Sequence, residues 1–236
     1  MLRQTDFEPI CYERRIVCFF DILGWKQHIK KAGSDPVEIS RLTFLPRLLT
    51  SKIVKDLNSK SSQFTSFSDC NVVSFTADEV DVERFVSGLS QIFLAAATEG
   101  FFLRAGVTVG DIYHDENMVF GPALNRAYQL EDAGKYPRIV LDELKPELTS
   151  LSCAQKDGET VFVEAFDCAF RNDEANRSDV IAAIVRAESL ILQSINDLRR
   201  NSDDSENGRH PTPLEKMEWL YPRVRKISKS ILNRVC

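Results

Sequence analysis

A short apolar run that ends on an aspartate constrains the fold of this chain more than any other feature. Residues 15–20 (Arg-Ile-Val-Cys-Phe-Phe) are rich in strand-forming side chains and predict a buried strand. Asp21 follows directly. Because an isolated buried charge is costly, the Asp21 carboxylate must be solvated, paired or bound to a metal ion. The sequence therefore predicts a buried strand with a carboxylate at its end.

The order of the remaining elements predicts an α+β fold. Apolar residues recur at helical spacing over 36–57, and two strands with a tight turn between them follow. The expected elements after this helix are strands at 63–67 and 71–76, a helix at 80–98, strands at 101–109 and 118–120, a helix at 122–133, and strands near 137–142 and 160–165. This order favours an antiparallel sheet with helices on one face, a ferredoxin-like core.

The last part of the chain has a different pattern. Residues 178–200 and 213–233 predict two amphipathic helices, and the polar residues 201–212 between them predict an exposed linker. We therefore divide the chain into a domain at 1–173 and a C-terminal helical region at 174–236. The sequence leaves the role of these helices open.

Charge and composition exclude several classes of partner. The chain has 236 residues and a formal net charge of -5, which argues against broad binding to nucleic acid or to an anionic membrane. No apolar run approaches the ~20 residues of a membrane span, and polar residues precede the first apolar run, so we expect a cytoplasmic protein. The six cysteines form no CxxC pair, which predicts reduced thiols and no zinc site.

A second aspartate, Asp69, lies in the predicted turn between the strands at 63–67 and 71–76. Aspartate is a common turn former, and this alone could explain it. If the first strand lies beside this hairpin, however, Asp21 and Asp69 project from the same end of the sheet. Two nearby carboxylates suit paired Mg²⁺ or Mn²⁺ ions, which can clamp a triphosphate. Gly24 could let backbone N–H groups approach a phosphate, or could simply form a turn.

Four short segments resemble the catalytic domain of class III nucleotidyl cyclases. They are Phe-Phe-Asp-Ile-Leu-Gly-Trp at 19–25, Phe-Ser-Asp at 67–69, Arg-Ala-Gly-Val-Thr-Val-Gly at 104–110 and Phe-Gly-Pro-Ala-Leu-Asn-Arg-Ala at 120–127. The resemblance covers roughly residues 15–142. It implies a head-to-tail homodimer in which each active site is built from both subunits.

The resemblance also implies roles for individual residues. Asp21 and Asp69 are similar to the family's two metal ligands, and the main-chain carbonyl of Ile22 to a further ligand, for two Mn²⁺ or Mg²⁺ ions per site. Asn125 matches the asparagine that orients the ribose across the dimer interface. The positions expected to face the substrate are Phe20, Leu23, Gly24, Trp25, Thr65, Met118 and Gln129, of which Leu23, Gly24 and Trp25 form the phosphate-cradling turn.

Two departures from the family pattern affect catalysis and base recognition. The family usually carries an arginine four residues after the asparagine, where it stabilises charge in the transition state, but this chain has Gln129. Arg126 and Arg138 are the candidate substitutes, and an ordinary surface arginine is the alternative for either. The polar pairs with which purine cyclases read their base are replaced by Thr65 and Met118.

The same segments, extended through Tyr-Gln-Leu-Glu at 128–131 and Tyr-Pro-Arg-Ile-Val at 136–140, resemble the pyrimidine cyclases of bacterial anti-phage Pycsar systems. The resemblance implies conversion of UTP to cyclic UMP and pyrophosphate, with CTP as the second choice. The product would act on a separate effector protein. The sequence gives no physical criterion that separates uracil from cytosine, and none that names an activator.

Three other functions remain open on the sequence. A non-catalytic nucleotide-binding domain of the same fold would explain Gln129. A palm-like domain acting on nucleic acid would share the sheet and the paired carboxylates, but the acidic balance argues against it. A purely structural adaptor would leave the aspartates at the strand ends unexplained.

Overall fold

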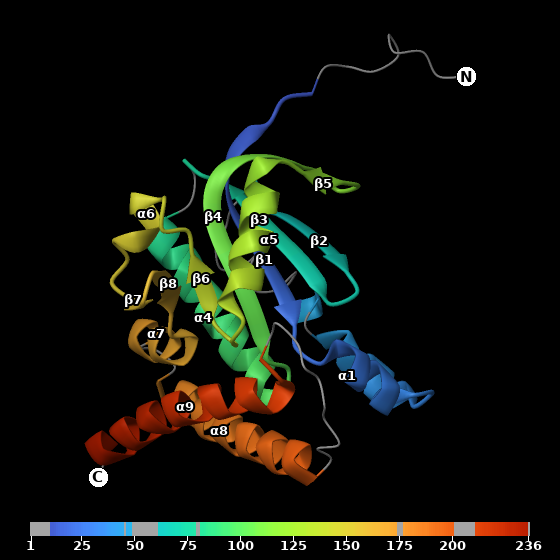
Figure 1. Ribbon diagram of the computed structural model, residues 1–236, viewed down its shortest axis with the longest axis vertical. Helices are drawn as coiled ribbons and strands as arrows, with labels where there is room; N and C mark the ends of the chain where they lie inside the picture. Colours follow the sequence, from blue (N-terminus) through green and yellow to red (C-terminus); the bar gives the residue numbers. More distant parts are fainter. Residues whose placement is uncertain are drawn as a thin grey trace.

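A computed structural model describes residues 10–44, 46–48, 61–78, 81–173, 177–200 and 211–235. Within these ranges the fold is built on an eight-stranded sheet in the order β2-β3-β1-β4-β6-β8-β7, with β5 paired to β4 (Figure 1). The strands are β1 (Glu13–Ile22), β2 (Gln63–Phe67), β3 (Cys70–Thr76), β4 (Leu103–His114), β5 (Val119–Phe120), β6 (Ile139–Leu141), β7 (Ala154–Asp157) and β8 (Thr160–Val163).

Helices surround this sheet and close its lower end (Figure 1). They are α1 (Trp25–Ala32), α2 (Pro36–Leu42), α4 (Val82–Thr98), α5 (Pro122–Gly134), α6 (Pro146–Thr149), α7 (Ala165–Asn172), α8 (Arg177–Arg200) and α9 (Pro213–Val235). The predicted α+β class with a C-terminal helical region is confirmed.

The predicted buried strand is β1, which lies in the interior of the sheet. All six residues from 15 to 20 are buried, because β3 pairs with one edge of β1 and β4 with the other, both antiparallel. Successive side chains of β1 point to opposite faces of the sheet. A strand that is apolar on both faces needs a covering layer on each side.

Both faces of the sheet are covered, which differs from the predicted single layer of helices. On one face Ile16 and Phe20 join a core with Phe85 and other apolar residues of α4. On the other face Val17 and Phe19 pack with the small residues of α5. The sheet is also mixed rather than purely antiparallel, since β4 and β6 are parallel. The apolar run at 16–20 of β1, which has side chains on both faces of the sheet, is the physical reason for the second layer.

Gly106 allows α5 to lie unusually close to β4. A Cβ atom at this position would lie 2.1 Å from the carbonyl oxygen of Ala127 and 2.7 Å from the backbone nitrogen of Glu131. Only glycine has no Cβ, so it permits this approach. The contact brings the C-terminal half of α5 down onto the face of the sheet that carries Asp21.

The C-terminal helices share a core with the rest of the fold. Ile184 and Ile191 of α8 and Leu220 and Val224 of α9 pack in one cluster with Phe166 of α7. The same cluster includes residues of α4, so α8 and α9 cover the side of α4 that faces away from the sheet. The predicted helical region is therefore packed against the preceding domain.

Most predicted elements have a counterpart, and the differences are local. The helical pattern at 36–57 yields α2, which ends at Leu42, while residues 49–57 lie outside the described ranges. The sequence did not predict β7 or α7, and α7 begins at Ala165, where a strand was expected to end. Within the described ranges, every helix is too short or too polar to cross a lipid bilayer.

Candidate active site

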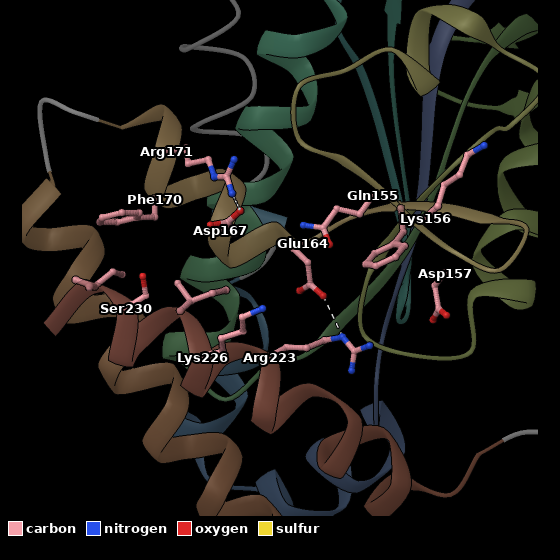
Figure 2. Close-up of a pocket in the computed structure, with 13 residues that line it drawn as sticks. Gln155, Lys156, Asp157, Glu164, Asp167, Phe170, Arg171, Arg223, Lys226 and Ser230 are labelled. Atoms are coloured by element: carbon pink, nitrogen blue, oxygen red, sulfur yellow. Dashed lines mark ion pairs between the residues drawn. The ribbon is translucent and has the colours of Figure 1, made fainter. Parts of the chain in front are cut away.

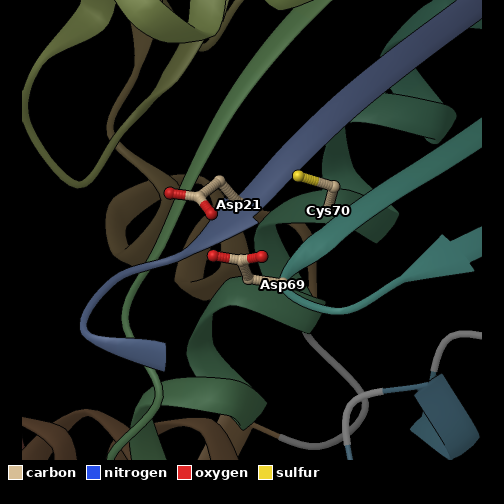
Figure 3. Close-up of side chains that lie close together, drawn as sticks. All are labelled: Asp21, Asp69 and Cys70. Atoms are coloured by element: carbon tan, nitrogen blue, oxygen red, sulfur yellow. The ribbon is translucent and has the colours of Figure 1, made fainter. Parts of the chain in front are cut away.

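Asp21 and Asp69 come together at one end of the sheet. Because β1 pairs with β3, the turn that precedes β3 lies beside the end of β1. Ser68 adopts a left-handed conformation in this turn, with φ of 58°. Side-chain ligand atoms of Asp21, Asp69 and Cys70 all lie within 4.8 Å of one another, and Figure 3 shows the two carboxylates facing each other.

Arg104 supplies a positive charge beside this pair. It lies directly opposite Asp21 in the β1–β4 register, so both side chains point to the same face of the sheet. Its Nη2 donates to Asp21 Oδ2 at 2.8 Å and lies 2.7 Å from Oε1 of Glu131, a residue of α5. One guanidinium therefore bridges a strand-end carboxylate and a helix carboxylate.

Burial raises the pKa of both carboxyls that contact Arg104. The pKa of Asp21 lies above its usual value because of burial and the nearby charge of Asp69, while Arg104 opposes this rise. Glu131 is only 3% exposed, and burial raises its pKa to about 7 despite the attraction of Arg104. The site therefore holds more acidic groups than Arg104 can neutralise, and a bound cation would lower their energy.

The chemistry of these donors fits a hard divalent cation. Mg²⁺ and Mn²⁺ prefer carboxylate oxygens, which Asp21 and Asp69 offer. Burial, and then the charges of Asp69 and Asp21, raise the pKa of the Cys70 thiol. A thiol that keeps its proton is a poor ligand for a metal such as zinc. The residues present thus fit the predicted magnesium or manganese ions.

The segment at 23–25 forms a sharp turn between β1 and α1. Gly24 has a φ of 72°, a left-handed conformation that favours glycine. The Leu23 N–H donates to the Phe102 carbonyl, so this amide is already engaged. Trp25 packs against the main core. Of the three predicted phosphate-cradling residues, Gly24 is exposed and the side chains of the other two pack inward.

Phe20 and Ile22 point away from the carboxylates. Their side chains are 1% and 2% exposed and lie in the core on the α4 side of the sheet. Successive residues of a strand face opposite sides, so the side chains that flank Asp21 are directed away from it. The Phe20 side chain therefore belongs to the core and does not face a substrate, which corrects that prediction.

Thr65 belongs to a buried polar network, and Met118 does not. Thr65 Oγ1 lies 3.0 Å from His114 Nε2, and His114 Nδ1 lies 2.8 Å from Ser74 Oγ, which accepts from Arg15. Burial and the charge of Arg15 lower the pKa of His114 to about 4. His114 is thus a buried neutral residue. Met118 lies in the β4–β5 turn and is half exposed.

The predicted residues of α5 divide between a solvent-facing surface and an ion-pair cluster. Asn125 and Gln129 are exposed, one helical turn apart. Arg126 donates instead to Asp142 Oδ1 at 2.7 Å and to Glu143 Oε1 at 2.7 Å. Within the described residues, Arg126 makes no contact with the aspartate pair.

Arg138 is held in a different cluster. Its Nε donates to the Gly134 carbonyl, its Nη1 donates to Asp157 at 3.3 Å, and its guanidinium lies over the rings of Phe162 and Trp219. The guanidinium therefore anchors α9 to the sheet. Neither candidate substitute for the family's arginine contacts Asp21, whereas Arg104 does.

A large depression elsewhere contains none of the predicted site residues. It has a volume of about 890 Å³ and lies between α7, α9 and the β7–β8 hairpin (Figure 2). Its charged groups pair with one another: Arg171 contacts Asp167 at 2.6 Å, and Arg223 contacts Glu164 at 3.0 Å. The first pair lies within α7, and the second connects the terminal helix α9 to the residue that precedes α7.

Sequence reasoning assigned no role to Arg104 or Glu131. Arg104 lies in the segment at 104–110 that resembles the cyclase family, but the strand register that places it opposite Asp21 is a tertiary property. The position of Glu131 on α5 indicated burial, because Glu131 lies one helical turn after Ala127, which is fully buried. A charged residue on the buried face of a helix requires a partner. That partner is Arg104.

Comparisons with known proteins find similarity only among solved structures. No sequence-family profile matches the chain, and no curated protein matches it. The adenylyl cyclase CyaB from P. aeruginosa is similar with a TM-score of 0.48 and 14% identity, over 64% of this chain and 92% of that chain. The catalytic core of a rhodopsin-guanylyl cyclase with converted specificity, in complex with ATPalphaS, has a TM-score of 0.48 and 17% identity, over 66% and 98%. A bacterial light-regulated adenylyl cyclase has a TM-score of 0.47 and 15% identity, over 76% and 100%.

Proposed function

We propose that this protein is a metal-dependent nucleotidyl cyclase. The observation that carries the proposal is the meeting of Asp21 and Asp69 at the end of the sheet, with Arg104 beside them and the Gly24 turn directly after Asp21. Hard carboxylate ligands next to a glycine turn suit a triphosphate bound with divalent ions. The four sequence segments that resemble class III cyclases support the same assignment.

The proposed reaction is an intramolecular phosphoryl transfer. The substrate 3′-oxygen forms a bond to the α-phosphorus and loses its proton, the bond from that phosphorus to the bridging oxygen breaks, and pyrophosphate leaves. Asp21 and Asp69 would hold the two ions, with the Ile22 carbonyl as a further ligand. Bound there, such ions lower the pKa of a coordinated hydroxyl and neutralise phosphate charge.

The chain's own residues would position this chemistry. Arg104 orients the Asp21 carboxylate through its 2.8 Å hydrogen bond, and Glu131 helps to hold the same Nη2 atom, which lies 2.7 Å from its Oε1. Asn125 is proposed to orient the ribose of the neighbouring subunit's substrate. Its exposure on α5 supports such a role across a homodimer interface.

We propose UTP as the substrate and CTP as the second choice, with the cyclic product acting on a separate effector in anti-phage defence. This assignment rests on the resemblance to Pycsar pyrimidine cyclases. Thr65 and Met118 are consistent with it, because neither belongs to the polar pairs with which purine cyclases read their base, and Thr65 bonds to His114 instead.

The direct test is an incubation of the purified protein with Mn²⁺ and each of ATP, GTP, CTP and UTP, with products identified by mass spectrometry. We expect a cyclic monophosphate from UTP. A cyclic product from ATP or GTP would support the cyclase assignment but refute a pyrimidine nucleotide as the substrate. Bound nucleotide without any product would favour a non-catalytic nucleotide-binding domain.

Variants connect that activity to the site. Asp21→Asn and Asp69→Asn are each expected to lower turnover at least about 100-fold, because each removes a metal ligand. Asp111→Asn is the matched control, since Asp111 is an exposed aspartate of β4. Wild-type turnover in a folded Asp21→Asn protein would refute the assignment.

A further inference from the structure

We propose that Lys216 of α9 binds the substrate's phosphates, so that the C-terminal helices complete the active site. This inference rests on the proposed function and extends it to a part of the chain outside the four motif segments. It concerns a residue that no sequence pattern singled out.

Helix α9 is fixed against the sheet one helical turn after Lys216. The ring of Trp219 stacks on Tyr136, with centroids 4.9 Å apart and an angle of 14° between the planes. The Cζ atom of Arg223 lies 3.7 Å from the centroid of the Trp219 ring, and the Arg223 guanidinium pairs with Glu164. Residues three apart on a helix share a face. The Trp219 anchor therefore sets where Lys216 points.

Lys216 lies within electrostatic reach of the candidate active site. Burial lowers its pKa, as does the charge of Arg104, whereas Asp21 and Glu131 oppose this change. These three groups are the ones that meet beside the aspartate pair. Within the described residues, Lys216 forms no ion pair, whereas Arg104 contacts both carboxylates.

A cavity connects Lys216 to the turn that follows Asp21. It has a volume of about 290 Å³ and is lined by Leu23 and Gly24 on one side and by Lys216 and Met217 on the other. Asp197 of α8 and His28 of α1 are the other titratable groups of its lining. The lysine thus shares an open space with the only exposed residue of the predicted phosphate turn.

These features together favour an anionic ligand for Lys216. An ammonium group that is half buried and has no ion pair among the described residues gains a charge-assisted hydrogen bond when a phosphate oxygen enters. Ions held by Asp21 and Asp69 would cancel the acidic charge that otherwise surrounds it. The β- and γ-phosphates of the substrate are the anionic groups expected to contact Lys216. The turn that lines the same cavity follows directly after Asp21, which is a proposed metal ligand.

The test measures binding of inorganic tripolyphosphate with Mn²⁺ by titration calorimetry. Lys216→Met removes the charge and keeps the aliphatic stem. We expect it to raise the Kd for tripolyphosphate roughly 10- to 100-fold. Lys216→Arg restores a cation and should stay within about threefold of the wild type. Lys229→Ala is the control, because Lys229 is an exposed lysine on the same helix. Thermal melts establish that each variant is folded.

The outcomes separate this inference from the proposed function. Wild-type tripolyphosphate affinity in Lys216→Met would overturn the inference even if the wild-type protein makes a cyclic nucleotide. A loss of affinity in Lys216→Met that Lys216→Arg restores would support it even if no nucleotide is cyclised. A fall in melting temperature without a change in Kd would show that Lys216 only balances the charge of Glu131.

Discussion

The close contact between β4 and α5 gives a prediction whose size follows from the structure. In Gly106→Ala, the new Cβ would lie 2.1 Å from the Ala127 carbonyl oxygen, and this distance must open by about 0.9 Å to reach even 3.0 Å. The clashing atoms belong to the backbone of α5, so no side-chain rotation relieves them. Overpacking of this kind usually costs 1–3 kcal/mol, and we expect the upper end, about 3 kcal/mol.

Gly88 provides a matched control of the opposite sign. It lies inside α4, and a Cβ built there meets no atom within 4 Å. Alanine is a better helix former than glycine, so Gly88→Ala should stabilise the fold by about 0.5–1 kcal/mol. The same chemical change thus has opposite effects at two positions.

Urea unfolding and thermal unfolding, both monitored by circular dichroism, measure both variants. For a chain of this size, Gly106→Ala should lower the melting temperature by about 6 °C or more, since 1 kcal/mol corresponds to roughly 2–4 °C. Because α5 carries Glu131, its displacement should also reduce cyclase turnover. A Gly106→Ala protein within about 0.5 kcal/mol of wild type would refute the proposed approach of α5 to the sheet.

Two further predictions concern the charged groups of the site. Burial raises the pKa of Glu131 from 4.5 to about 7, so between these values the folded state keeps a proton that the unfolded state has lost, and stability falls as pH rises. Without divalent ions, the change in unfolding free energy from pH 5 to pH 7.5, measured by urea unfolding, should be up to about 3 kcal/mol less favourable to the folded state in the wild type than in Glu131→Gln, because His114 and the other groups titrate in both proteins; parallel pH profiles would contradict the buried acid. Cys70→Ser should keep Mn²⁺-dependent turnover within about threefold, because a protonated thiol is a weak ligand. Loss of metal affinity in that variant, measured by calorimetry, would instead make Cys70 a ligand.

Local patterns determined most of the secondary structure. The hairpin predicted at 63–67 and 71–76 corresponds to β2 and β3, because two short runs of strand-forming residues around a tight turn have few other solutions. The helices predicted at 80–98 and 122–133 correspond to α4 and α5, since helical periodicity over a dozen residues is a strong signal. Short elements such as β7 and α7 were missed, because four to eight residues contain too little periodicity to identify.

The arrangement of charges could not be read from the chain. Arg126 and Arg138 were the expected cations, but Asp142 and the Trp219 cluster hold them elsewhere. His114 bonds to Thr65 and Ser74 inside the fold. A side chain's environment depends on strands and helices far away in sequence, so composition around the residue does not reveal it.

By itself the sequence determined an apolar strand with a carboxylate at its end, a second carboxylate in a hairpin turn, and two amphipathic terminal helices. Each of these is a property of neighbouring residues. The tertiary structure alone decided that Arg104 stands opposite Asp21, that α5 lowers Glu131 onto the same guanidinium, and that α9 brings Lys216 to that end of the sheet. Strand register and helix packing determine this arrangement, because they bring residues as far apart in the chain as Asp21 and Lys216 to the same end of the sheet.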